Sequence, residues 1–384
     1  MISQTRRAQA TRLVVLGALS LCDRTAHAGG GAATDAYDDI DDDAVVVHGL
    51  ADAYFEGAFN KPSFGMNQLR AFDAQTGVPA LGMLRATLAH KPRTFGFRLD
   101  AGLGAVADGY LRFDPAAATH PGLSRGLSYV EQAFVTVIVP VGRGLEVDAG
   151  KFETPVGLED NEALDNWNYS RSLLYLLAEP SYHAGLRLTY PVTSTLSAST
   201  FWVNGWDANV LGGNGMRAFA AAVSWRPVAS LEVVADYMGG PERAPTRLSA
   251  PTLSFRNELD AYARCRVTDR VTVASTVDYG RDAASGGVSW WGIGAYARVQ
   301  VVPWLAGSLR GEHYDDSDGF TSGAKQRLEE VTATVELRGE VHATKWVGRL
   351  EYRRDQSDEP SFAVGMAGRG THQDTLGVSL LAAF

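Results

Sequence analysis

The chain has 384 residues, of which 45% are hydrophobic and 21% are charged, and its formal net charge is −9. This composition is too apolar and too aromatic for a chain that is disordered throughout. The negative charge argues against a protein that binds nucleic acid through bulk electrostatics. No stretch of about 18 uncharged apolar residues occurs, so a transmembrane helix is not expected. A globular α/β protein, a large β protein and an outer-membrane β-barrel remain.

Residues 1–28 have the features of a secretory signal peptide. Three arginines precede an apolar run over 13–21, and Ala26-His27-Ala28 follows as a small-x-small cleavage site. We expect cleavage after Ala28 and export from the cytoplasm. Lipidation at Cys22 is the less favoured alternative, because Leu21 stands where a lipoprotein signal has a small residue. The removed segment carries four arginines and one aspartate, so the mature chain is more acidic than the precursor.

Residues 29–43 form an acidic leader that precedes the folded part. Its aspartates lack the glycine turn and the closing glutamate of a calcium-binding loop, so a solvated periplasmic linker is the better interpretation. The expected organisation is therefore a signal peptide over 1–28, a leader over 29–43 and a β-barrel over 44–384.

From residue 44 onward the hydrophobic pattern has a period of two, which is typical of strands. In the last segment Leu376, Val378, Leu380, Ala382 and Phe384 share one face. Sixteen segments of this kind are predicted as strands: 44–57, 78–90, 93–105, 127–139, 144–152, 181–191, 195–204, 216–226, 230–239, 254–267, 270–281, 288–301, 304–314, 328–340, 345–355 and 372–384.

The connections between these segments alternate between short and long. This asymmetry is typical of transmembrane barrels, which have short periplasmic turns and long extracellular loops. Hydrocarbon offers no hydrogen-bond partner, so a sheet in a membrane must close on itself. The sequence therefore predicts an all-β fold, a transmembrane antiparallel up-and-down β-barrel of about sixteen strands with both termini in the periplasm.

Three motifs in the middle of the chain resemble a known family. They are Gly150-Lys151-Phe152-Glu153-Thr154-Pro155-Val156-Gly157, Asp165-Asn166-Trp167-Asn168-Tyr169-Ser170-Arg171-Ser172 and the run over 183–191. In this order they are similar to the OmpL-like β-barrel porins of Gram-negative outer membranes, and the segment 47–55 is similar to the family's first strand. The resemblance implies a general or weakly selective pore. The stretch 158–162 is more acidic than the family pattern.

The chain ends on a strand that closes with Phe384. The pattern over 375–384 is similar to the C-terminal signal that the outer-membrane barrel assembly machinery reads. We therefore expect this machinery to be a partner, with Phe384 as the assembly signal.

The longest expected loop, 153–180, is the third outside loop, which in trimeric general porins folds into the lumen. Candidate constriction residues on it are Glu159, Asp160, Glu162, Asp165 and Arg171. Candidate pore-wall residues are Arg85, Arg98, Arg187, Arg264, Arg298, Arg310, Arg338, Arg349 and Arg353. Opposed charges across a pore filter solutes by charge, and the acidic loop predicts a weak cation preference. In the alternative, the loop stays outside and the wall charges pair among themselves.

The favoured function is an outer-membrane porin, a water-filled channel for passive diffusion of small hydrophilic solutes or ions. The alternative is a plugged barrel that binds partners at the surface through long acidic loops. A secreted soluble β protein is a third possibility. We expect no enzyme activity, because neither His183 nor His313, both expected on lumen faces, has a nucleophile motif beside it. Outer-membrane lipid is an expected partner, whereas nucleic acid and cofactors are not expected. The oligomeric state stays open.

Overall fold

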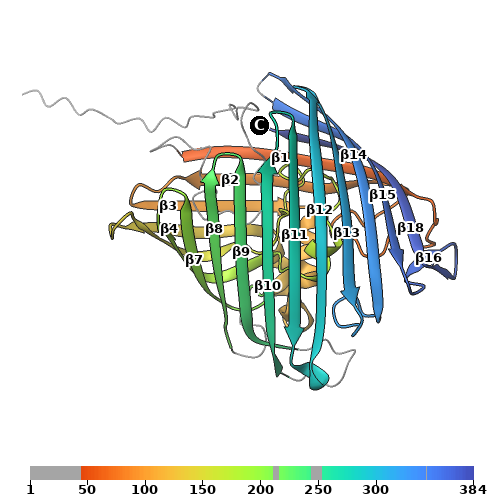
Figure 1. Cartoon of the computed structure of the whole chain (residues 1–384), viewed down its shortest axis with the longest axis horizontal. Coiled ribbons are helices and arrows are strands. Elements are labelled where there is room, and N and C mark those ends of the chain that lie inside the picture. Colours follow the sequence, from red (N-terminus) through yellow and green to blue (C-terminus); the bar gives the residue numbers. More distant parts are fainter. Residues whose placement is uncertain (1–44, 211–215, 244–252, 343) are drawn as a thin grey trace, which may run out of the picture.

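The structure is a computed structural model that describes residues 45–210, 216–243, 253–342 and 344–384. The expected signal peptide over 1–28 and the acidic leader over 29–43 lie outside the described residues. Sixteen antiparallel strands close into a barrel, in which each strand pairs with its neighbours and β1 pairs with β18 (Figure 1). The predicted fold class is confirmed, and the expected strand ranges agree with the structure to within a few residues.

The barrel strands follow the chain without crossing. They are β1 (Val45–Ala58), β2 (Pro79–His90), β3 (Phe95–Leu103), β4 (Val130–Val139), β5 (Leu145–Glu153), β6 (Tyr182–Pro191), β7 (Leu196–Val203), β8 (Ala218–Val228), β9 (Leu231–Arg243), β10 (Leu253–Arg266), β11 (Val271–Asp282), β12 (Val288–Val302), β13 (Leu305–Asp316), β14 (Gln326–Val341), β15 (Thr344–Ser357) and β18 (His372–Ala383).

The two faces of each strand have different environments. In β18, Leu376, Val378 and Leu380 point outward and are 45–58% exposed, whereas Thr375 and Leu381 point inward and are buried. An apolar outer face suits lipid, and the inner face can carry charge only where water or partner groups meet it.

His313 lies on the outer face, so the expectation that it faces the lumen is wrong. It contacts the Trp291 ring at a centroid distance of 5.0 Å and pairs with Glu329 at 2.6 Å. The reason is the strict alternation of β13, which turns Arg310 inward and therefore turns His313, three residues later, outward. His183, by contrast, is fully buried on the inner face, as expected.

The barrel closes where the last strand meets the first. The Gly49 N–H donates to the Phe384 carbonyl at 2.7 Å, and the Phe384 N–H donates to the Gly49 carbonyl at 3.0 Å. A Cβ atom at position 49 would overlap the far edge of the Phe384 ring, so the ring packs directly against this glycine. Figure 1 marks the C-terminus beside β1. The terminal residue is thus part of the pairing that removes the open sheet edge.

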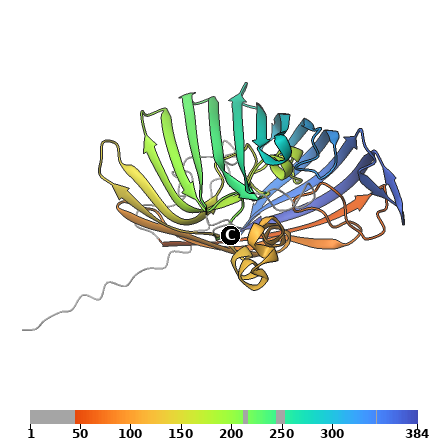
Figure 2. The same cartoon turned by 90° about the horizontal axis from the view of Figure 1, so that it is seen from below.

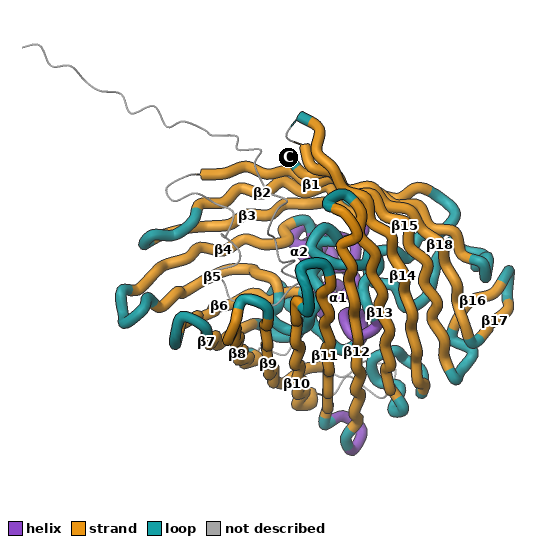
Figure 3. Tube along the Cα trace, turned by 45° about the horizontal axis from the view of Figure 1, so that its top comes forward, coloured by secondary structure: helices purple, strands orange, loops and turns teal. Residues whose placement is uncertain are grey.

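The long connections contain helices and a hairpin that the period-two pattern does not predict. They are α1 (Ala105–Phe113), η2 (Pro115–Ala118), α2 (Pro121–Ser128), α3 (Leu173–Leu177), η3 (Ala284–Gly286), β16 (Phe362–Val364) and β17 (Gly368–Gly370). In Figure 3 the purple α1 and α2 lie within the outline of the strands. Tyr110 of α1 is fully buried and its ring centroid is 4.8 Å from that of Tyr182. None of the helices among the described residues is long and apolar enough to cross a bilayer.

Candidate functional site

The connection between β5 and β6, residues 154–181, lies inside the barrel, and we call it the inner loop. The main-chain N–H groups of Tyr169 and Ser170 donate to the Glu351 carboxylate of β15 at 2.6 and 2.9 Å. Two strands away on the same side of the barrel, the Leu173 N–H donates to Glu312 of β13 at 2.8 Å. Both glutamates are on the inner face of the wall and are buried. Figure 2 shows the yellow-green trace of this region within the arc of the strands.

Wall arginines bind the carbonyl groups of the same loop. Arg349 donates to the carbonyl oxygens of Ala163 at 2.6 Å and Asn166 at 2.7 Å, and Arg353 donates to the Arg171 carbonyl at 2.5 Å. Buried main-chain groups need partners, and an irregular loop has no strand ladder to supply them. Charges of both signs on the wall therefore satisfy the donors and the acceptors of the inner loop.

Two of the predicted constriction carboxylates form ion pairs with the wall. Glu159 lies 2.7 Å from Arg310 and also accepts a hydrogen bond from the Ser172 N–H at 2.6 Å. Glu162 pairs with Arg85 of β2. Acidic loop residues do face wall arginines, but in direct contact rather than across a water-filled gap.

The other three predicted constriction residues have different environments. Burial raises the pKa of Asp160, whose carboxylate accepts a hydrogen bond from the Glu162 N–H at 3.0 Å. Arg171 donates to three carbonyl oxygens of its own loop, including that of Asp160 at 2.9 Å, so it holds the loop together. Asp165 lines a cavity of the lumen.

The nine predicted wall arginines all lie on the inner side of the barrel, and each is within 4.0 Å of a carboxylate. All nine pair with an acid of the wall itself, since Arg85 also lies 3.8 Å from Glu131 and Arg310 lies 3.0 Å from Glu330, and Glu336 alone takes three. The pairs are Arg85 with Glu162, Arg98 with Asp100, Arg187 with Asp148, Arg264 with Glu232, Arg298, Arg338 and Arg349 with Glu336, Arg310 with Glu159 and Arg353 with Asp355.

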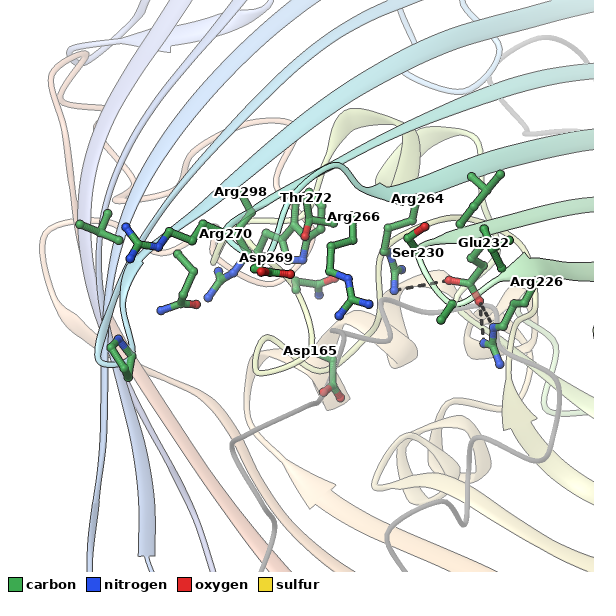
Figure 4. Close-up of a pocket in the computed structure, with 18 of the residues that line it drawn as sticks. Asp165, Arg226, Ser230, Glu232, Arg264, Arg266, Asp269, Arg270, Thr272 and Arg298 are labelled. Atoms are coloured by element: carbon green, nitrogen blue, oxygen red, sulfur yellow. Dashed lines mark hydrogen bonds and ion pairs between the residues drawn. The ribbon is translucent and has the colours of Figure 1, made fainter.

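A cavity of about 910 Å³ lies between the inner loop and the short-turn end of the barrel, and we call it the vestibule. The inner loop borders it with residues 164–167, and the turns around Ser230, Asp269 and Pro303 form its rim. Figure 4 shows arginine side chains from several strands directed into this space. Its charged lining consists of six arginines and three carboxylates: Arg226, Arg264, Arg266, Arg270, Arg298, Arg338, Asp165, Glu232 and Asp269.

The sequence reasoning missed part of this lining. Arg226 and Arg270 are at strand ends beside short turns. The period-two pattern stops there, so it does not predict whether a side chain points into the lumen or toward the lipid. Arg266 and Arg270 make no ion pair with any residue in the described ranges, whereas Arg226 pairs with Glu232 at 2.6 Å. The signal that could have found them is their common position at the short-turn end of neighbouring strands.

Several solved structures have the same fold at low sequence identity. An anion-selective porin from Comamonas acidovorans is 12% identical with a TM-score of 0.57, covering 89% of this chain and 99% of that chain. The outer membrane channel DcaP of Acinetobacter baumannii is 9% identical with a TM-score of 0.58, covering 93% and 100%. A trimer form of OmpT from Vibrio cholerae is 11% identical with a TM-score of 0.56, covering 90% and 100%. No curated protein sequence matches the chain.

The closed barrel, with its apolar exterior and charged interior, is that of an outer-membrane β-barrel porin. The profile of one porin family, described as "putative beta-barrel porin-2, OmpL-like", matches residues 44–384. The chain belongs to this family, and the resemblance seen in its sequence motifs is confirmed.

Proposed function

We propose that the protein is a passive channel of the outer membrane for small hydrophilic solutes. The observation that carries this is the closed sixteen-strand barrel whose charged inner face surrounds a vestibule of about 910 Å³. Barrels of this size enclose an aqueous lumen, whereas eight-strand barrels are filled by side chains. The function involves no catalytic step, and the inner charges serve to hold the loop and to line the path.

The proposed location follows from the two ends of the barrel. After cleavage at Ala28, the short-turn end would face the periplasm and the long loops would face outward, as in bacterial barrels generally. Outer-membrane lipid would cover the apolar exterior. The last strand, with Phe384 against Gly49, would be the segment that the assembly machinery recognises.

The vestibule supports a preference for anions, which is the opposite of the weak cation preference expected from the sequence. That expectation assumed that Glu159, Asp160, Glu162 and Asp165 present free negative charge to the pore. In the structure Glu159 and Glu162 are paired with arginines, Asp160 is half-buried and accepts a hydrogen bond within the loop, and Asp165 is one of three carboxylates among six arginines in the vestibule lining. The lining of the vestibule has more arginines than carboxylates, and fixed charge in a low-dielectric passage concentrates the oppositely charged ion.

Liposome swelling tests the proposed function. Liposomes that contain the purified protein should swell in isotonic solutions of small sugars, at a rate that falls as the sugar becomes larger. The matched control is a variant in which two introduced cysteines form a disulfide between the inner loop and the wall, tested in the same liposomes. Absence of swelling with any sugar, from protein that is shown to be folded, would contradict passive diffusion.

A plugged barrel is the second candidate, because the inner loop is so well bound. Glu159, Arg310 and Glu351 are all buried at the contact between loop and wall. If the loop blocks the lumen, the protein would act through its surface loops. Stable conductance steps in a bilayer favour the channel, and silence of the folded barrel favours the plug.

A further inference from the structure

Three neighbouring strands place aspartates directly opposite one another on the inner wall. In the register of the sheet, Asp260 of β10 faces Asp236 of β9 on one side and Asp278 of β11 on the other. All three side chains point inward and are 4% exposed or less. Like charges at directly opposed positions destabilise a sheet. The three aspartates therefore need a positive charge, and the strand residues beside them do not supply it.

The inner loop adds a fourth carboxylate instead of a cation. Glu179, near the end of the loop, brings an oxygen to Asp260 and Asp278, and ligand oxygens of the three residues lie within 4.8 Å of one another. Gly157 from the start of the loop packs against this group with φ at +97°, and a Cβ there would overlap the Glu179 carboxylate. Its N–H donates to Asp260 at 3.2 Å. The two ends of the inner loop therefore converge on the same point of the wall.

Several carboxylate oxygens here, including Glu179 Oε2, lack hydrogen-bond partners, although Asp260 accepts from the Gly157 N–H and from the Thr276 hydroxyl at 3.0 Å. Asp278 is fully buried, and neither of its oxygens accepts a hydrogen bond from any described residue; the same holds for Asp236 and Glu258. Within the described ranges no lysine or arginine lies within 4.0 Å of Glu179, Asp260 or Asp278. Arg256, on the same face of β10, pairs with Asp282 at 3.1 Å instead. Carboxylates elsewhere on this wall pair with arginines, as Asp148 and Glu336 do, or accept main-chain N–H groups, as Glu351 does, whereas both oxygens of Asp278 have neither.

We propose that Glu179, Asp260 and Asp278 bind one calcium ion, which joins the inner loop to β10 and β11. Buried unpaired carboxylates carry a large desolvation cost that a bound cation removes. An all-oxygen donor set without histidine or cysteine selects a hard cation. Calcium accepts six to eight oxygen ligands in flexible geometry at about 2.3–2.6 Å, whereas magnesium demands a near-ideal octahedron and keeps several waters. The flexible geometry of calcium suits carboxylates held by two strands and a loop, and Asp236 and Glu258 add negative charge around them.

The site gives the ion a mechanical role. One ligand comes from the loop and two come from the wall, so removal of the ion leaves the repulsion of three carboxylates, opposed at this contact by the Gly157 N–H hydrogen bond to Asp260. The arginine contacts of the loop lie elsewhere, on β2, β13 and β15. Calcium would therefore fix the β10–β11 side of the inner loop and so would set how much of the lumen it fills.

Calcium titration of the purified full barrel tests this inference. The protein would be kept in detergent, free of lipopolysaccharide and treated with a chelator, and calcium alone would be followed by isothermal calorimetry and thermal unfolding. We expect one bound ion per chain and a rise in unfolding temperature, with a weaker response to magnesium. Asp278→Asn and Glu179→Gln should each weaken calcium binding by about tenfold or more and should reduce the thermal shift.

Asp148→Asn is the matched control, because Asp148 is equally buried on the inner wall but pairs with Arg187 at 2.8 Å. It should keep the calcium response. The inference is overturned if the wild-type barrel binds no calcium at millimolar concentration, if magnesium acts equally well, or if Asp278→Asn and Glu179→Gln bind calcium as the wild type does. Because Glu179 lies in the loop outside the strands, its variant separates ligand loss from failure of the barrel to form.

Discussion

Removal of the Glu351 carboxylate should release the inner loop from the wall. This side chain accepts the N–H groups of Tyr169 and Ser170 at 2.6 and 2.9 Å and the Thr334 hydroxyl at 2.7 Å. A hydrogen bond to a charged group contributes about 1.5–3 kcal/mol, so loss of the two main-chain bonds should weaken loop docking by about 3–6 kcal/mol. This corresponds to a factor on the order of 10²–10⁴ in the equilibrium between docked and released loop.

Single-channel recording measures this effect. Glu351→Ala should give a larger mean conductance and more open-channel noise than the wild type, because the loop leaves part of the lumen for part of the time. Glu351→Gln, which keeps one acceptor oxygen, should give an intermediate result. Glu340→Ala, at an exposed position near the turn after β14, should change neither quantity. Wild-type conductance and noise in Glu351→Ala would refute the role of wall charges as anchors of the loop.

Three further predictions concern selectivity, assembly and pH. Arg266→Gln combined with Arg270→Gln should lower the anion-to-cation permeability ratio by up to about fivefold per charge at low salt, whereas the exposed Arg369→Gln should leave the reversal potential unchanged. Phe384→Asp should reduce the heat-modifiable folded barrel without blocking export; an undiminished folded fraction would contradict the seam contact with Gly49. Burial raises the pKa of Asp207 to about 7, so ionisation destabilises the fold: stability should fall from about pH 4 to pH 7, and Asp207→Asn should flatten this slope in thermal unfolding.

The strands could be predicted from the sequence because the lipid and the lumen impose opposite demands on alternate residues. Leu376, Val378 and Leu380 must be apolar because they face lipid, whereas Thr375 faces the lumen and need not be. The alternation itself therefore predicts which side chains point outward. The same rule placed Arg310 and Arg349 on the inner wall. The prediction of the inner and outer faces fails where the alternation was assigned to the wrong face, as for His313.

The long loops could not be predicted in the same way. Their conformation depends on contacts between residues that are far apart in the chain, such as Ser170 with Arg310 or Gly157 with Asp260. The periodicity of hydrophobic residues contains no information about which distant residues form such contacts. The short helix α2 begins at Pro121 and α1 ends shortly before Pro115, but both are too short to show an amphipathic repeat. The vestibule arises from turns of several strands, and its arginines come together only when the barrel closes.

The most direct measurement of the central claim is the conductance of the purified wild-type protein in a planar lipid bilayer. The account predicts discrete, stable steps of current in concentrated salt, and under a salt gradient it predicts a reversal potential of the sign that indicates anion preference. A folded barrel that inserts into the bilayer and carries no current would contradict the channel.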